Sequence, residues 1–206
     1  YLYMSELNAD YDNPWKEALN DYFEPFLKFC FPKVHELIDW RRKPLSLDKE
    51  LQQIALNSDS GKRIADKLFQ VWLKNGSNAW ILVHIEVQSQ KEADFAQRMY
   101  QYHYRAFDLH CTQVISLAVL GDETKTWRPN NFGYNLGGCS LSLEFPIIKL
   151  IDYESRWQEL EASNNPFAVV IMAHLKTKAT TGKPNQREEW KWQIIRGLYE
   201  RGYEKS

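Results

Sequence analysis

Residues 63–89, RIADKLFQVWLKNGSNAWILVHIEVQS, predict two neighbouring strands at the centre of a β-sheet. The stretches 63–73 and 79–89 are rich in apolar and β-branched residues, which favour strands. Between them, Lys74-Asn75-Gly76-Ser77 is typical of a tight hairpin turn. In the second stretch, alternate residues point to opposite faces, so a period of two places Glu86 and Gln88 on one face.

Helical patterns flank this hairpin, and the order of the segments predicts an α/β protein with a central mixed sheet covered by helices. The expected helices are 14–30, begun by Asn13-Pro14 and ended by Pro32, then 48–57 within an otherwise irregular stretch 33–61, 91–109, 154–162, 167–178 and 186–203. A buried strand is expected at 113–120, and short strands within 132–152, around 141–145 and 147–151, with a turn at Gly137-Gly138. The residues expected to face the core from the first and the 91–109 helices are Trp15, Leu19, Tyr22, Phe23, Phe26, Leu27, Phe95, Met99, Tyr102 and Ala106.

Length and composition favour one globular domain. The chain has 206 residues, of which 44% are hydrophobic and 26% charged. We expect residues 1–206 to form a single domain, with an α/β core over about 10–152 and a C-terminal helical segment over about 153–206.

A formal net charge of −1 argues against a large nonspecific nucleic-acid interface, because neutralised phosphates supply much of the affinity of such surfaces. A local basic groove beside an acidic metal site is still compatible with this net charge, because the two sets of charges cancel. Three clusters are candidates for it, although each is also typical of a solvated surface: Arg41-Arg42-Lys43; Lys62-Arg63 with Lys67; and Lys176 with Lys178 and Lys183.

Cys30, Cys111 and Cys139 form no CxxC pair, so we expect small buried thiols rather than a zinc site or a disulfide framework. The first residues lack a basic stretch followed by an apolar run, which predicts no signal peptide. No apolar run reaches the length of a membrane span, so we expect a cytoplasmic protein. Nucleotide-binding glycine loops, a GxSxG elbow and histidine pairs at metal-ligand spacing are also missing from the sequence.

The residues that suggest chemistry are Asp66 on the first strand and the Glu86-Val87-Gln88 triplet on the second. Two carboxylates on neighbouring strands can hold Mg²⁺, which prefers oxygen ligands and leaves positions for water and a substrate phosphate. Asp66 is equally compatible with a strand-edge ion pair to Lys67 or Arg63. Glu86 is harder to explain structurally, because an unpaired charge among apolar strand residues is costly to bury.

These residues resemble the PD-(D/E)XK nuclease superfamily and, more narrowly, the Rpn family of recombination-promoting nucleases, whose members are also labelled as transposases. The resemblance extends from about residue 10 to the end of the chain. The segments that carry it are 13–19 (NPWKEAL), 47–52 (LDKELQ), 65–68 (ADKL), 84–88 (HIEVQ), 95–100 (FAQRMY), 127–129 (WRP) and 173–177 (AHLKT).

The resemblance implies a restriction-endonuclease-like core and a Mg²⁺-dependent DNA endonuclease, with Mn²⁺ as a substitute, linked to recombination, mobile elements or phage defence. Asp66 and Glu86 would bind the metal, with the Val87 carbonyl completing its shell. Gln88 would occupy the position usually held by lysine, where its amide would either orient the attacking water or hold a phosphate oxygen. Glu17 of the first helix would orient the site or touch a metal-bound water.

A substrate-contacting set follows from the same resemblance, with Arg98 and Tyr102 placed one turn apart on a helix face and Lys67 beside Asp66. Core-edge packing and a surface ion pair are the structural alternatives for Arg98 and Tyr102. Two active sites are the simplest way to cut both strands of a duplex, which favours a homodimer.

Gln88 departs from the superfamily pattern, in which a lysine more often ends the triplet. An amide stabilises developing negative charge less well than an ammonium group. The competing hypothesis is therefore a nuclease-fold protein with weak cutting that acts as a DNA- or protein-binding module. A purely structural interaction protein is a third reading, which requires the acidic residues to be ion-paired away from any cleft.

Overall fold

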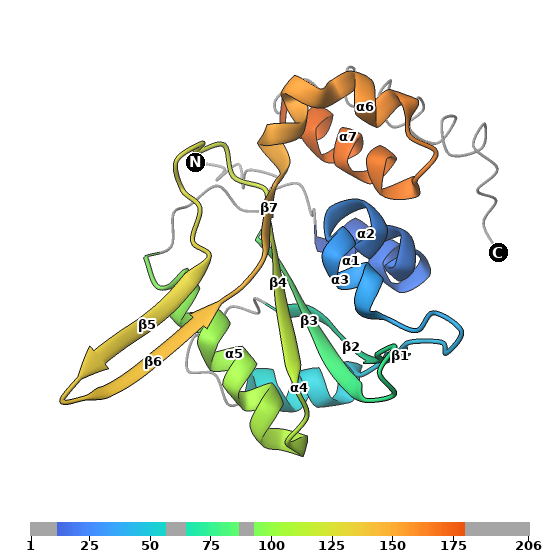
Figure 1. The fold of residues 1–206 in the computed structure, drawn as a ribbon. Helices are drawn as coiled ribbons and strands as arrows, with labels where there is room; N and C mark the ends of the chain where they lie inside the picture. The colour runs from blue at the N-terminus through green and yellow to red at the C-terminus, as the bar shows by residue number, and fades with distance from the viewer. Residues whose placement is uncertain (1–11, 57–64, 87–92, 180–206) are drawn as a thin grey trace, which may run out of the picture.

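The computed structural model describes residues 12–56, 65–86 and 93–179 (Figure 1). Its main element is a five-stranded mixed sheet in the order β1-β2-β3-β4-β7. A separate two-stranded hairpin contains β5 and β6. The strands are β1 (Leu45–Ser46), β2 (Ala65–Trp72), β3 (Asn78–Glu86), β4 (Val114–Leu120), β5 (Asn131–Leu136), β6 (Cys139–Glu144) and β7 (Ile147–Lys149). The helices are α1 (Asp12–Asp21), α2 (Phe23–Cys30), α3 (Pro32–Leu37), α4 (Asp48–Leu56), α5 (Phe95–His110), the 3₁₀ helix η1 (Leu150–Arg156), α6 (Trp157–Ala162) and α7 (Pro166–Ala179).

The central strand β3 is buried on both faces. Ile81 and Val83 pack into one core cluster, whereas Trp80 and Leu82 pack into another. Figure 1 shows α1–α3 and α6–α7 on one side of the sheet and α4 and α5 on the other. The predicted α/β architecture, a mixed sheet flanked by helices, is confirmed.

Strand direction changes at β3. It pairs antiparallel with β2 and parallel with β4, and β4 pairs parallel with β7. The antiparallel pair is joined by the predicted turn, in which Gly76 has φ +88° and the Asn75 side chain accepts the Ser77 backbone N–H at 3.0 Å. A positive φ is strained for any residue with a Cβ, which explains the glycine at this position.

The first helical segment is interrupted, so the prediction of one helix over 14–30 was wrong. Tyr22 (φ −131°, ψ 39°) separates α1 from α2. Pro25 is the cause, because a proline ring clashes with the carbonyl four residues earlier, here that of Asp21, and offers no N–H. In the first turn of a new helix the same proline is tolerated. The apolar spacing continues across the break, and Trp15, Leu19, Phe23, Phe26 and Leu27 are all buried as predicted, with Tyr22 partly buried against them.

Three other boundaries differ from the sequence prediction. Pro32 does not simply end a helix but begins α3, so the segment after it is more regular than expected. Helix α5 begins at Phe95 rather than near Lys91, since Ala93 and Asp94 form a turn. The strand expected over 147–151 ends at Lys149, where η1 begins.

Helices α4 and α7 and strands β4 and β6 lie close to where the sequence predicts them. By contrast, β1 falls in the stretch that was expected to be irregular, β5 was not predicted, and the helix expected over 154–162 is divided between η1 and α6. The stripe Phe95, Met99, Tyr102 and Ala106 of α5 is buried. Leu160 of α6 and Phe167 of α7 lie in the same cluster as Leu19 and Ile81, so these helices pack on the sheet. The helix predicted over 186–203 lies outside the described residues. None of the helices that the structure describes combines the length and the apolar character of a membrane span.

The cysteine prediction was only partly right. Cys30 is buried, and burial raises the pKa of its thiol above the usual range. Cys111 and Cys139 are exposed instead of buried. Cys111 follows the last residue of α5 in a left-handed conformation (φ 48°), and Cys139 begins β6 next to a turn. Both lie at chain reversals, which are normally at the surface.

We predict that His103 makes stability fall in mild acid. Its Nδ1 atom lies 3.0 Å from Oγ of Ser116 on β4, and burial lowers the pKa of its imidazole. Above the ordinary histidine pKa of about 6.5, both folded and unfolded chains are neutral at this residue. As the pH falls below that value the unfolded chain takes up the proton first, so stability is lost. Urea denaturation of the wild type and of His103→Gln at pH 7.5 and pH 5.0 should show a smaller acid loss in the variant. Equal losses in both proteins would contradict this assignment.

Candidate active site at one end of the sheet

The backbone register places Asp66 and Glu86 at the same end of adjacent strands. Glu86 is the last residue of β3, and Ala65, the first residue of β2, pairs with His84. A β-bulge occurs between Ala65 and Lys67, so Asp66 is the extra residue that the ladder leaves over. From ordinary strand spacings, the Cα atoms of Asp66 and Glu86 are roughly 8–11 Å apart.

The same end of the sheet continues across two further strands. Glu86 pairs with Leu120 of β4, and Leu120 pairs with Lys149 of β7. Lys149 is therefore in the same cross-strand row as Glu86, two strands away, at roughly 10 Å. Asp122 follows the end of β4 by two residues.

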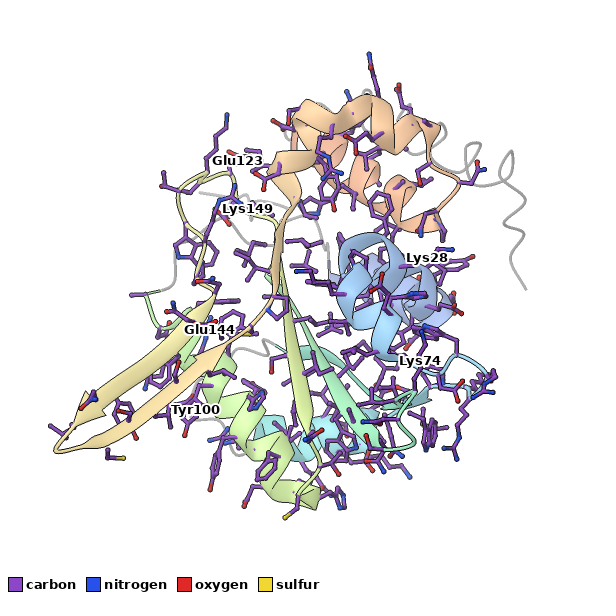
Figure 2. The ribbon with its side chains drawn as sticks, viewed as in Figure 1. Lys28, Lys74, Tyr100, Glu123, Glu144 and Lys149 are labelled. Atoms are coloured by element: carbon purple, nitrogen blue, oxygen red, sulfur yellow. The ribbon has the colours of Figure 1, made fainter. Side chains whose placement is uncertain are left out.

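Asp122 and Lys149 form a buried ion pair. Their side chains are 1% and 0% exposed, and Nζ of Lys149 donates to Oδ2 of Asp122 at 2.5 Å. The same ammonium group donates to the Trp127 carbonyl at 2.9 Å and lies 5.2 Å from the centre of the Trp127 ring. Oδ1 of Asp122 accepts the backbone N–H of Thr124. Figure 2 shows Lys149 reaching from β7 toward the loop that carries Glu123.

These contacts fix the β4–β5 loop against the sheet. The Trp127 ring also packs edge-on against Phe95, the first residue of α5, at 5.4 Å. At the outer side of the loop, Arg128 donates two hydrogen bonds to Asp152, at 2.9 and 2.6 Å. These bonds hold the pKa of the Asp152 carboxyl below its usual range. The loop is thus held at both ends, next to the point where β3 ends.

Arg98 and Tyr102 share one face of α5, as predicted, and both are buried. Tyr102 packs with Leu68 and Leu82 of the sheet. The Arg98 guanidinium lies 3.9 Å from the Asp94 carboxylate one turn earlier. Both residues thus fit core-edge packing, and their role toward a substrate stays a prediction.

Glu17 is exposed on α1. Because α1 and α5 cover opposite faces of the sheet, Glu17 and Arg98 are carried on opposite sides of it. Lys67 is buried, and its ammonium group donates to both carboxylate oxygens of Asp48 at 3.1 and 3.3 Å. Lys67 therefore anchors the first turn of α4, and substrate binding by this residue stays a prediction.

The cluster Arg41-Arg42-Lys43 is not beside the predicted site, which corrects one of the three expected positions for a basic groove. Arg42 stacks on Trp72, which pairs with Asn78 at the start of β3. Glu86 is eight positions after Asn78, which corresponds to roughly 26 Å along an extended strand. In the third cluster, Lys176 lies over the Trp157 ring. Lys62, Arg63 and Lys183 lie outside the described residues.

Part of the predicted site lies outside the residues that the structure describes. Val87 and Gln88 are not among the described residues, and the positions of Asp66 and Glu86 are known from the backbone register alone. Among the residues whose side chains are described, no group of three or more His, Cys, Asp or Glu could hold a metal ion. The roles predicted for Asp66, Glu86, Val87 and Gln88 therefore remain predictions.

A mixed sheet with helices on both faces is consistent with a restriction-endonuclease-like core. Residues 18–118 match the model of the family described as "Putative transposase, YhgA-like", and the chain is similar to that family over this region. The match covers the segments 47–52, 65–68, 84–88 and 95–100 that suggested the resemblance. No curated protein and no solved structure matches the chain.

Sequence reasoning missed the Asp122–Lys149 pair. One signal was available, because Lys149 stands between apolar residues in Ile147-Ile148-Lys149-Leu150, the same pattern that drew attention to Glu86. The partner could not be read from the chain, since the two residues are 27 positions apart.

We predict that Lys149→Met lowers the free energy of unfolding by about 3–5 kcal/mol, because it leaves the buried Asp122 carboxylate without its counter-charge. Arg128→Met is the matched control from the same loop. Its ion pair with Asp152 is 42% and 45% exposed, so its loss should cost about 1 kcal/mol or less. Urea denaturation measures both.

The double variant Asp122→Leu/Lys149→Met should recover much of the loss, because it removes both charges. A Lys149→Met protein as stable as the Arg128→Met protein would show that the buried pair does not hold this loop.

Proposed function

We propose that this protein is a metal-dependent nuclease that hydrolyses phosphodiester bonds in DNA. The observation that carries the proposal is the register that brings Asp66 and Glu86 to one end of neighbouring strands. Both residues lie within the region that matches the transposase family, and transposition requires DNA strands to be cut.

The available groups fit a hard divalent cation. Asp66 and Glu86 would hold Mg²⁺, or Mn²⁺ in its place, through carboxylate oxygens, and the Val87 carbonyl would add a third oxygen. A separation of roughly 8–11 Å between the two Cα atoms suits two acidic side chains that share one ion. When bound, the cation polarises the phosphate and lowers the pKa of a coordinated water.

The remaining residues would act on water and phosphate. In hydrolysis, a water oxygen bonds to phosphorus, the bond from phosphorus to the leaving sugar oxygen breaks, and a proton passes from the water to solvent or a base while the leaving oxygen gains one. The Gln88 amide would orient the attacking water, and Glu17 would accept a hydrogen bond from water near the acidic pair. Arg98, Tyr102 and Lys67 would contact phosphate oxygens once substrate rearranges their present contacts.

A link to recombination, mobile elements or phage defence is part of the proposal, with DNA as the partner. The description of the matched family supports a role on mobile DNA. A cytoplasmic location would give the protein access to that substrate.

The second candidate is a nuclease-fold protein with weak cutting that acts as a DNA- or protein-binding module, and a shortage of positive charge to stabilise the reacting phosphate favours it. Lys67 and Lys149 are committed to carboxylates, and the Arg41–Lys43 cluster lies at the far end of the sheet. Among the described residues, Lys67, Lys149 and the Arg41–Lys43 cluster therefore contribute little positive charge beside Asp66 and Glu86. Gln88 adds none.

We predict that Asp66→Asn and Glu86→Gln each reduce metal-dependent plasmid nicking about 100-fold or more. Each change removes a carboxylate charge and keeps the side-chain shape, and even changes to residues that only support metal ligands cost 10- to 100-fold. Glu123→Gln is the matched control, since Glu123 is an exposed carboxylate near the same end of the sheet. The assay compares Mg²⁺, Mn²⁺ and EDTA, with thermal melts to check folding.

Cutting that survives in folded Asp66→Asn and Glu86→Gln proteins would remove these residues from the site. If folded wild-type protein binds DNA without cutting single- or double-stranded substrates, the binding module becomes the better description.

We also predict that Gln88→Lys retains or raises nicking activity. The ammonium group would stabilise negative charge on the phosphate better than the amide does. Initial nicking rates at equal protein concentration measure the effect. Loss of activity in a folded variant would show that the amide itself has a role that lysine cannot replace.

A further inference from the structure

The β5–β6 hairpin has two chemically different faces. Cross-strand partners share a face, and the register pairs Phe132 with Leu143, Tyr134 with Leu141 and Leu136 with Cys139. All six of these residues are apolar. The intervening pairs join Asn131 to Glu144, Gly133 to Ser142 and Asn135 to Ser140, so the other face is polar. This alternation is typical of a sheet that buries one face against another surface.

Among the residues that the structure describes, the contacts with the apolar face are at its base. Phe132 stacks on Tyr100 of α5, with ring centres 5.2 Å apart, and Leu143 packs against the cluster around Phe95. Toward the tip, Tyr134 is 50% exposed and Leu136 is 78% exposed. Figure 1 shows the hairpin projecting away from the main sheet, and in the described part of the chain no third strand pairs with it.

The uncovered surface continues onto α5. Tyr104 stacks on Tyr100 and is 52% exposed, so an aromatic series runs from the helix through Phe132 to Tyr134. Monomeric proteins seldom leave a continuous apolar surface of this kind in contact with water. A two-stranded hairpin is also only marginally stable without packing on one face.

The charges on the hairpin indicate what covers it. Between Pro129 and Ile148 the only charged residue is Glu144, on the polar face near the base. A nucleic-acid surface needs Lys or Arg to neutralise phosphates, so this face is unsuited to that partner. An uncharged apolar face is complementary to itself, because two copies bring no like charges together, and a two-fold interface uses the same patch on both subunits.

We propose that the apolar face of this hairpin joins two copies of the chain. Tyr134, Leu136 and Leu141 of one copy pack face to face on the same residues of the second, with the two hairpins separated by the usual distance of about 10 Å between stacked sheets. The pairing holds whether or not the protein cuts DNA. If the protein is a nuclease, such a dimer carries two active sites.

The test is the solution mass of the full chain and of two variants that each add one negative charge. Sedimentation velocity of the wild type should give twice the 24.4 kDa chain mass at high concentration. Leu136→Asp, on the apolar face, should raise the dissociation constant about 10-fold or more. Asn135→Asp, the next residue on the polar face, should leave it unchanged within about twofold. Thermal melts check that both variants fold.

The exposed thiols give a second readout. Cys139 is on the apolar face, whereas Cys111 follows the end of α5. Mass spectrometry of maleimide labelling should show Cys139 reacting more slowly as the dimer forms, while Cys111 keeps its rate. A single-chain mass at all concentrations, or a dimer that persists in Leu136→Asp with Cys139 still reactive, would overturn the proposal.

Discussion

The double burial of β3 is the constraint on which the other elements depend. Its two edges are hydrogen-bonded to β2 and β4, and its two faces contact different core clusters. A slip of one residue would exchange the side chains of Ile81 and Val83 with those of Trp80 and Leu82, which pack against different helices. The register is therefore fixed by packing. Because it is fixed, the chain positions of Asp66 and Glu86 at one end of the sheet are fixed as well.

Buried polar contacts stabilise the end of the sheet that carries Asp66 and Glu86. The Asp122–Lys149 pair has an additional acceptor in the Trp127 carbonyl and an aromatic ring over the ammonium group. The buried charges need these partners because no water solvates them. The loop that this pair anchors contacts the first residue of α5 through Trp127 and Phe95. Direct contacts thus link the β4–β5 loop to the sheet beside the end of β3 and to the start of α5, next to the candidate site.

Local signals in the sequence predicted the elements that are determined locally. The Asn75-Gly76 turn, the stripe on α5 and the buried strand β4 were all recognisable. The break at Tyr22 could not be predicted from the apolar spacing, which continues across it. It is caused by Pro25, which prevents α1 from continuing into α2. Exposure of Cys111 and Cys139 depends on chain reversals that composition does not report. For the site, residue types suggested the chemistry, but only the register showed that Arg41–Lys43 lies far from Glu86 and that Lys149 lies in its row.

The connection between β4 and β7 has a consequence for how this fold can vary. These parallel strands are joined through the β5–β6 hairpin, whose first and last residues, Asn131 and Glu144, pair with each other. The chain therefore leaves and re-enters the body of the protein at nearly the same point, about 5 Å apart. Residue pairs can be added or removed at the tip without shifting β7, η1 or the Lys149 contact. Hairpin length is thus free to diverge among related chains while the sheet keeps its register, and in the proposed dimer such a change would alter only the contact between the two copies.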